Sequence, residues 1–420
     1  MTRTTEDLSA LQGRTLNVLR GASIPAQAAV SSVVAVGTLL AKDLLGGDRW
    51  AGLASAGWTL GAAITSVPLA ASMRRRGRRP GLVVALLLGG CGTLIAAAGG
   101  QLRSFPIFLI GMLLIGCGQS AALQARYVGA DLASEVDRAK AIGAVVWVGT
   151  LGAVIGPVFV PHEKRFGKWL GLDEYIGPFF FAGGFFLIAS VVYLVFLKPD
   201  PLIIAGGTDP DAERVRPIRQ LRRSYVEIRR SHTALLGLVA MAASQATMVG
   251  VMTMTPPHMK DHGQADLSAI VIAVHILGMF GLAPLTGRFV ASVGGVRAVQ
   301  LGAVILGIGT VVTVASGYVP AMIFVGLFLV GVGWNLGLIG GTTLLTSSVP
   351  LDTRVEAQGT GDLTLSFCGA VAAFGSGFVK QAAGFHILAN MATGVAAGLL
   401  IFALLTQARI GRLAAPVQQV

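Results

Sequence analysis

Charged residues are scarce in this chain of 420 residues: they make up 12% of it, whereas hydrophobic residues make up 54%. About 25% of a soluble domain is charged, so this chain lacks the polar side chains that a water-soluble core of its size needs. It has only three cysteines, all inside apolar runs, which argues against a disulfide framework. It also lacks a phosphate-binding Gly-x-x-x-x-Gly-Lys loop, so we expect no direct use of ATP, no cofactor and no enzymatic reaction.

What the chain does contain is a series of apolar segments, each near the length of about 20 residues that a helix needs to cross a membrane. These runs are too long and too continuous for the alternating pattern of barrel strands. The sequence therefore predicts an all-α polytopic membrane protein whose twelve transmembrane helices leave both termini on one side. We place the helices at 22–42, 50–73, 81–101, 105–131, 139–161, 176–197, 233–257, 267–290, 297–317, 320–348, 355–380 and 385–406.

A long hydrophilic stretch, 198–232, separates the first six predicted helices from the last six. It divides the chain into a first six-helix bundle at 1–197, a basic linker, and a second six-helix bundle at 233–420. The arginines of this linker are Arg214, Arg216, Arg219, Arg222, Arg223, Arg229 and Arg230. Apolar residues recur along the linker on one helical stripe, which indicates either an amphipathic helix on the anionic inner leaflet or a disordered basic tether. The residues of the stripe are Ile218, Leu221, Tyr225 and Ile228.

Basic residues are distributed unevenly between the two sides of the predicted bundle. With the termini and the linker counted, 23 Lys and Arg residues fall on one face and 8 on the other, and Arg126 lies within a helix. Because positive charge accumulates in cytoplasmic loops, we predict a multi-pass protein of the inner cell membrane with both termini and the linker in the cytoplasm. This asymmetry accounts for the net charge of +12 without a nucleic-acid partner. We expect a monomer that contacts lipid and a small-molecule substrate.

Two short patterns recur about half a chain apart. Arg138-Ala-Lys-Ala-Ile-Gly opens the fifth predicted helix, and Arg354-Val-Glu-Ala-Gln-Gly opens the eleventh, 216 residues later. Gly77 and Gly294, 217 residues apart, occupy corresponding loops. These matches indicate that the two halves are related by duplication, an arrangement in which secondary transporters bind substrate between the repeats near the middle of the membrane.

The loop between the second and third predicted helices reads Arg74-Arg-Arg-Gly77-Arg-Arg-Pro-Gly. Its spacing resembles the loop signature of the major facilitator superfamily, Gly-x-x-x-Asp-Arg-x-Gly-Arg-Arg. The matching residues are Arg75, Gly77, Arg78 and Arg79, whereas Ala70 and Arg74 stand where the signature has glycine and aspartate. The resemblance implies the superfamily's fold of two pseudo-symmetric six-helix bundles, with this loop controlling closure. Anchoring of the loop to lipid phosphate by its arginines is the alternative interpretation.

The fifth predicted helix carries small residues and a proline at fixed spacing: Gly143, Gly152, Gly156 and Pro157. Gly152 and Gly156 make a flat face for close contact with a facing helix, and Pro157 bends the helix by removing a backbone hydrogen bond. Such a helix suits the contact between the two halves, where it would control closure. The spacing resembles the antiporter motif of drug:proton exporters in the same superfamily, without its trailing Gly-Gly. This resemblance implies export driven by a proton gradient; a generic packing face is the alternative.

Asp362 is the one carboxylate that lies clearly within a predicted helix, whereas Asp131 and Glu356 lie at helix ends. A carboxylate in hydrocarbon costs about 2.5 kcal/mol or more unless it is paired, protonated or facing water. We predict that Asp362 carries the coupled proton; the alternative is a structural carboxylate held by a hydroxyl or an arginine. Asp131 is grouped with the closure residues. Glu356 is expected to cap its own helix through the Thr353-Arg-Val-Glu356 capping box.

Arg126 is the matching cation on the fourth predicted helix, and it shares a face with Gln119. We predict that it contacts substrate or pairs with Asp362; alternatively it extends to the inner surface beside Asp131. In the superfamily, helices one, four, seven and ten line the central cavity. The resemblance therefore implies further substrate-binding candidates: Gln27, Gln119, Gln245, Trp334 and Asn335. Each of them could instead make a hydrogen bond between helices.

The predicted function is secondary active transport, with proton-coupled efflux of a small organic or amphipathic compound by alternating access. A metabolite uptake symporter and a non-transporting membrane receptor remain alternatives. Histidines and methionines near the predicted outer face also leave open a transition-metal exporter, with His258 and His275 as weak candidate ligands.

Overall fold

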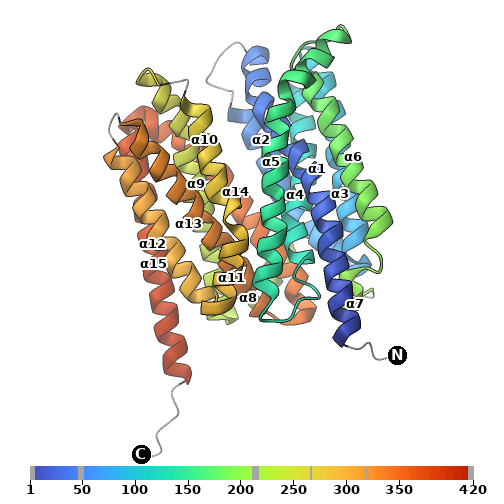
Figure 1. The fold of residues 1–420 in the computed structure, drawn as a ribbon, viewed down its shortest axis with the longest axis vertical. Coiled ribbons are helices and arrows are strands. Elements are labelled where there is room, and N and C mark those ends of the chain that lie inside the picture. The colour runs from blue at the N-terminus through green and yellow to red at the C-terminus, as the bar shows by residue number, and fades with distance from the viewer. Residues whose placement is uncertain (1–4, 46–51, 211–216, 265–266, 317–318, 415–420) are drawn as a thin grey trace, which may run out of the picture.

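The structure is a computed structural model, which describes residues 5–45, 52–210, 217–264, 267–316 and 319–414. In these residues it contains helices and no strand, and 12 helical stretches are long and apolar enough to cross a membrane. The predicted all-α membrane fold with twelve transmembrane helices is therefore confirmed. Figure 1 shows two groups of roughly upright helices that lie side by side.

The first group contains α1 (Thr5–Leu45), α2 (Gly52–Arg76), α3 (Arg78–Gln101), α4 (Phe105–Val128), α5 (Arg138–Trp169) and α6 (Gly177–Phe196). Two linker helices follow, α7 (Pro201–Ile204) and α8 (Pro217–Arg230). The second group contains α9 (His232–Asp261), α10 (Ser268–Ile276), the π-helix η3 (Leu277–Gly281), α11 (Ala283–Val293), α12 (Gly295–Ala315), α13 (Pro320–Ser347), α14 (Leu351–Ala383) and α15 (Phe385–Ala414). One transmembrane span, Ile270–Val293, is thus interrupted by a π-helical turn.

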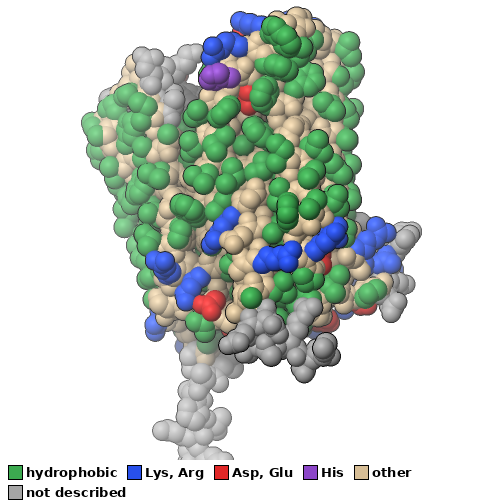
Figure 2. Space-filling view, turned by 45° about the vertical axis from the view of Figure 1, so that its right-hand side comes forward, with side chains coloured by type: hydrophobic (Ala, Val, Ile, Leu, Met, Phe, Trp, Pro, Cys, Tyr) green, Lys and Arg blue, Asp and Glu red, His purple; other side chains and the backbone are tan. Residues whose placement is uncertain are grey.

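The helix ends define two ends of the molecule. In Figure 1, α1 begins and α15 ends at the bottom, where α7 and α8 also lie. We call this the linker end, and the opposite one the distal end. Figure 2 shows hydrophobic side chains over most of the visible face, and most of its Lys and Arg side chains lie in a band toward the linker end. Large apolar side chains such as Ile64, Val84, Leu187 and Phe374 are more than half exposed, which suits a surface in contact with lipid.

Two loop glycines show the relation between the halves. Gly77 between α2 and α3 has φ 91° and ψ 173°, and Gly294 between α11 and α12 has φ 85° and ψ 156°. Only glycine adopts this backbone region readily, because other residues have a Cβ that clashes there. The same turn therefore occurs at corresponding positions, as the repeat in the sequence predicts.

A second pair of repeat-related glycines lies where the halves meet. A Cβ on Gly143 would lie 2.5 Å from the carbonyl oxygen of Ala283, so α5 crosses α11 in close contact. A Cβ on Gly359 would lie 2.5 Å from the Cβ of Ala70, so α14 crosses α2 in the same way. The absence of a side chain allows the two backbones to approach at each crossing.

α5 is longer than the sequence predicts, since it continues to Trp169 instead of ending at 161. The expected loop at 162–175 is therefore helical in its first half. Pro157 and Pro161 both lie inside the helix without ending it. The hydropathy falls at the charged residues after Pro161, but one of them, Glu163, is fully buried in the bundle.

The linker segment 217–230 is an α-helix, and the arginines at 214 and 216 lie outside the described residues. Its expected apolar stripe is only partly correct. Ile228 is buried, but Ile218 and Tyr225 are 71% and 45% exposed.

Two polar residues, Gln220 and Ser224, are buried together with Ile228 on the inner side of α8. The hydroxyl of Ser224 lies 2.5 Å from that of Thr360, so α8 packs on α14 through a polar contact that an apolar stripe does not indicate.

Candidate functional site

Asp362 lies in α14 and is completely buried. Its carboxylate forms an ion pair with Arg126 of α4. It also accepts hydrogen bonds from the side-chain amide of Gln124 at 2.9 Å and from the hydroxyl of Tyr127 at 3.3 Å. A buried charge needs such partners, since removing one would leave an uncompensated charge in the interior. The polar partners of Asp362 thus all come from α4, in the other half of the molecule.

Arg126 is 3% exposed, and its guanidinium group donates hydrogen bonds to several further acceptors. It donates to the carbonyl of Leu123 at 2.7 Å and to the hydroxyl of Tyr127 at 3.1 Å. It also donates to the hydroxyl of Thr342 in α13 at 3.3 Å. Of the alternatives that the sequence leaves open for Arg126, the structure shows the pairing with Asp362.

The alternative that Arg126 extends to Asp131 is not seen. Asp131 instead forms an ion pair with Arg78 at the start of α3. Two nitrogens of Arg78 lie 2.8 and 2.9 Å from the two carboxylate oxygens, a bidentate geometry that is favourable for an Arg–carboxylate pair. Arg78 also donates to the side-chain oxygens of Gln124 at 3.1 Å and Gln358 at 2.7 Å. Gln358 belongs to α14, so the signature loop contacts the second half.

Gln124 joins the two buried ion pairs into one network. Its oxygen accepts from Arg78, and its nitrogen donates to Asp362. The network therefore runs from Asp131 through Arg78 and Gln124 to Asp362 and Arg126. We call these five residues the buried charge network. It lies in the half of the bundle nearer the linker end, because it uses the last two turns of α4 and the first four turns of α14.

A further ion pair joins Arg74 at the end of α2 to Glu356 of α14. The expectation that Glu356 caps its own helix is wrong: α14 begins at Leu351, and Thr353 bonds to the carbonyl of Pro350. Arg138 of α5 donates to the hydroxyl of Ser347 at 2.8 Å and adds a contact between the halves.

All these contacts lie toward the linker end. Among the side chains that the structure describes, no hydrogen bond or ion pair joins the two halves at the distal end. The linker end is therefore held closed by polar contacts between the halves in this conformation.

The predicted cavity residues fall into different environments. Trp334 of α13 donates through its indole nitrogen to Gln245 of α9 at 2.7 Å and packs edge-on against Phe280. Asn335 turns away from this pair and donates to the carbonyl of Met279 in η3, inside the second half. Asn335 is fully buried, so it supports the π-helical turn and does not line an open cavity here.

Gln27 and Gln119 are the candidates from the first half. Gln27 of α1 packs beside Gly152 of α5, whose added Cβ would meet it at 2.8 Å. Gln119 of α4 is partly exposed, and its side-chain oxygen is buried with no hydrogen-bond partner among the described residues. The Gln119 amide oxygen is therefore free to accept a hydrogen bond from a ligand.

The glycines of α5 divide between two contacts. Gly143 packs against α11 of the other half, as predicted. Gly152 and Gly156 pack against α1 of the same half, where added Cβ atoms would lie 2.2 Å from the carbonyl of Ile24 and 2.1 Å from the hydroxyl of Ser31. The prediction that they face the other half is wrong for this conformation. Gly152 lies eight intervening residues beyond Gly143, past the short crossing with α11, and α1 packs along more of α5 than α11 does.

The other residues of the signature loop hold the turn itself. The carboxylate of Asp200 fills the space beside Gly77, where an added Cβ would lie 2.6 Å from its oxygen. The same carboxylate accepts from the backbone nitrogen of Arg79 at 2.7 Å, and the Arg79 guanidinium donates to the carbonyl of Leu194. The Nε of Arg75 is buried with no partner among the described residues.

The weak metal candidates lie in separate surroundings. His258 stacks on Phe385, with ring centroids 4.2 Å apart, and lies beside His262 and His386. His275 is fully buried and bonds to the carbonyl of Leu327. Within the described residues, no group of three or more His, Cys, Asp or Glu side chains is arranged to hold a metal ion.

Sequence reasoning missed Gln124, Tyr127 and Thr342 as partners of the central ion pair. The seven-residue spacing between Gln119 and Arg126 selects residues on one face of α4. It does not select Gln124 and Tyr127, which are close to Arg126 in the sequence. A search for every polar side chain within one turn of Arg126 would have found Gln124 and Tyr127. Thr342 carries no such signal, because its contact depends on how α13 packs.

Comparison with known proteins agrees with this fold. The model for the Major Facilitator Superfamily matches residues 22–373. YddS of Bacillus subtilis, described as an uncharacterized MFS-type transporter, is 34% identical over 388 residues, covering 91% of this chain and 88% of that protein. The riboflavin transporter RfnT of Brucella anthropi is 30% identical over 359 residues, covering 85% and 86%.

Solved structures of transporters match as well. FucP in the outward conformation aligns with a TM-score of 0.70 at 13% identity, covering 93% of this chain and 98% of that one. The proton:xylose symporter XylE aligns with a TM-score of 0.73 at 15% identity, covering 94% and 95%. At these identities the likeness shows the fold alone. From the family match and the relatives, the chain belongs to the Major Facilitator Superfamily, whose members are membrane transport proteins and not enzymes.

Proposed function

We propose that this protein exports a small organic or amphipathic compound in exchange for protons, by alternating access between its two halves. The halves are 1–197 and 233–420, and 198–232 is the linker between them. One observation carries the proposal: the ion pair between Arg126 and Asp362 is buried and lies across the halves. Any motion that opens the linker end must separate these two residues.

The linker end is assigned to the cytoplasm, because basic residues accumulate in cytoplasmic loops and 23 of them belong to this face. The structure then represents the state that is closed to the cytoplasm. The contacts that close it are the buried charge network, the pair of Arg74 with Glu356, and the bond of Arg138 with Ser347.

Protonation and closure compete for the same carboxylate. A carboxylate separated from its cation in a site shielded from water costs several kcal/mol, and a bound proton removes that charge. A proton that reaches Asp362 from the distal side would displace Arg126 and release the closed end. Loss of the proton to the cytoplasm would restore the ion pair and close the end again. One cycle moves a proton inward and a substrate molecule outward.

The substrate would bind on the distal side of the buried charge network, toward the middle of the membrane. Gln119 has a free amide oxygen, and Gln245 with Trp334 presents an amide next to an aromatic ring. This lining suits a flat molecule with polar edges, the kind of compound that the relative RfnT transports. Arg126 would reach an acidic group of the substrate only after the ion pair opens. Gln27 and Asn335 would contribute through packing.

Uptake by proton symport is the second candidate. It is favoured by the position of Gly152 and Gly156, which pack against α1 within one half. The exporter-like spacing in α5 therefore does not mark the contact between halves in this conformation. Symport would use the same ion pair with the opposite order of substrate and proton release.

The test is transport by purified protein in liposomes with an imposed pH gradient. Riboflavin and a lipophilic cation dye are offered in separate assays, and a trapped pH-sensitive dye follows protons. Asp362→Asn removes the protonatable group, so it is expected to abolish gradient-driven accumulation while leaving downhill exchange measurable. Asp137→Asn is the matched control, since Asp137 is an exposed carboxylate that pairs only locally with Lys140 and Ser134.

Three outcomes decide the proposal. Loss of accumulation in Asp362→Asn but not in Asp137→Asn supports coupling through Asp362. Unchanged proton movement in Asp362→Asn removes this residue from the mechanism. Accumulation on the side of the linker end would replace export by uptake.

A further inference from the structure

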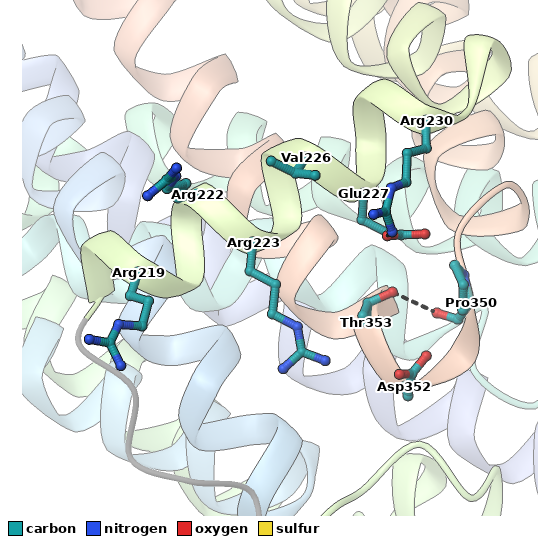
Figure 3. Close-up of a pocket in the computed structure, with 9 residues that line it drawn as sticks. All are labelled: Arg219, Arg222, Arg223, Val226, Glu227, Arg230, Pro350, Asp352 and Thr353. Atoms are coloured by element: carbon teal, nitrogen blue, oxygen red, sulfur yellow. Dashed lines mark hydrogen bonds and ion pairs between the residues drawn. The ribbon is translucent and has the colours of Figure 1, made fainter.

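A basic pocket lies at the linker end, between α8 and the beginning of α14. Its volume is about 450 Å³. It is lined by Arg219, Arg222, Arg223, Val226, Glu227, Arg230, Pro350, Asp352 and Thr353. Figure 3 shows α8 running across the view, with the Arg219 and Arg223 side chains extending from it on the side of Asp352 and Thr353. The mechanism proposed above uses none of these residues.

The charges of this pocket are not balanced within the protein. Arg230 pairs with Glu227 at 2.9 Å. In contrast, the guanidinium groups of Arg219, Arg222 and Arg223 make no hydrogen bond or ion pair with any described residue, and Asp352 is the only other carboxylate in the lining. The pocket therefore carries a net positive charge that a bound anion would neutralise. Arginine forks match the oxygens of a phosphate group in particular.

Apolar side chains accompany these arginines on the exposed side of α8. Ile218 is 71% exposed, and Tyr225 and Val226 are each 45% exposed. A soluble anion would leave such side chains in water, whereas a lipid surface would cover them. Basic residues beside exposed apolar and aromatic ones are typical of helices that lie at an anionic membrane surface.

The helix that carries the arginines is fixed to the helix that carries the coupling carboxylate. Ser224 of α8 bonds to Thr360 of α14, and Ile228 is buried against the second half. Thr360 lies half a turn from Asp362 and one turn from Glu356 on the same helix. A ligand that bridges α8 and the first turn of α14 would therefore restrain the helix that must move when the linker end opens.

We propose that the headgroup phosphate of an anionic phospholipid binds in this pocket and stabilises the state that is closed at the linker end. The site rests on the pocket geometry alone, whereas its effect on the transport cycle rests on the proposed function. Lipid in the inner leaflet would thus act as a regulator of the transporter, separate from its substrate.

The experiment compares the protein in nanodiscs of phosphatidylcholine with and without phosphatidylglycerol. The first readout is the temperature of thermal unfolding. The test variant is Arg219→Gln/Arg223→Gln, and the matched control is Arg229→Gln. Arg229 is on the same helix and has the same charge, but it stacks on Tyr225 and does not line the pocket. A further arm adds pyrophosphate to the phosphatidylcholine discs.

The second readout reports the conformation. Ser66 of α2 is fully buried where α2 crosses α14, so Ser66→Cys is expected to react with a maleimide only when the two halves separate there. The native cysteines are replaced for this assay. Phosphatidylglycerol is expected to raise the unfolding temperature and to slow labelling of Ser66→Cys. Since each basic residue near an anionic surface changes affinity by about fivefold, the double variant should lose more than tenfold in lipid affinity.

The outcomes separate the two levels of the proposal. Stabilisation by phosphatidylglycerol that is lost in the double variant and kept in Arg229→Gln establishes the lipid site. Equal losses in both variants, or stabilisation by pyrophosphate and not by lipid, overturn it. Lipid binding without any change in the labelling of Ser66→Cys would contradict the proposed regulation but not the lipid site. Proton coupling through Asp362 is measured separately, in the liposome assay.

Discussion

Arg74 at the end of α2 and Glu356 in the second turn of α14 form an ion pair across the two halves of the molecule. Both side chains are largely shielded from solvent. In the signature that the loop resembles, an aspartate occupies the position of Arg74. This chain therefore closes its linker end with a cation from the first half and an anion from the second.

Exchanging the two charges tests this contact. Arg74→Glu alone and Glu356→Arg alone place like charges together, and each is expected to destabilise the closed state by about 3 kcal/mol. The double exchange restores opposite charges and should recover most of the loss. Labelling of Ser66→Cys measures the closed state in all three variants. Failure of the double variant to recover, when each single variant folds, would show that the pair does not control closure.

The crossing of α5 and α11 tolerates no side chain at Gly143. A Cβ there would lie 2.5 Å from the carbonyl oxygen of Ala283 and 3.2 Å from the Cα of Gly287. Gly143→Val is expected to separate the helices, to reduce transport more than tenfold and to accelerate labelling of Ser66→Cys. Gly149→Ala is the control, because the nearest atom to its Cβ is 4.0 Å away. Equal transport by both variants would contradict close packing at this crossing.

Trp334 and Gln245 are expected to act as one unit in substrate binding. Trp334→Phe keeps the edge-on contact with Phe280 but removes the 2.7 Å hydrogen bond to Gln245. Each single variant, Trp334→Phe and Gln245→Leu, should raise KM by about fivefold, the effect of losing one hydrogen bond of about 1 kcal/mol. The double variant should add little to either one. A double variant whose effect equals the product of the single effects would show that the two residues act separately.

Burial lowers the pKa of His258 to about 4, with smaller contributions from His262, His386 and Lys380, while Asp261 opposes the shift. The residue lies beyond the end of its transmembrane span, at the distal end. A histidine with a lowered pKa is neutral in the folded protein, so its contribution to stability is present above the unfolded value of about 6.5. That contribution is lost as the pH falls from 6.5 toward 4.

We therefore expect the unfolding temperature to fall with acidity in this range and to fall less in His258→Asn. His232→Asn is the control, since His232 is exposed at the beginning of α9. A pH profile that is identical in the wild type and in His258→Asn would exclude this histidine as the source of the dependence.

The sequence by itself determined the number of spans and the basic linker, and it singled out Asp362 as a carboxylate within a span. Hydropathy over about 20 residues is a local property, and a lone carboxylate in such a run is visible without any knowledge of packing. It also indicated the duplication, because Gly77 and Gly294 need the same unusual backbone and so remain glycine in both halves.

Only the tertiary structure decided which helices these residues meet. The pairing of Asp362 with both Arg126 and the hydroxyl of Tyr127, and the link through Gln124, depend on the rotation of α4 against α14. The contact of Gly152 with α1 and the burial of Glu163 also depend on packing. A small residue in a membrane helix allows close contact, and a polar one can hydrogen-bond, with whichever helix packs beside it. Hydropathy predicts which residues are removed from water, but it carries no information about which neighbouring helix they contact.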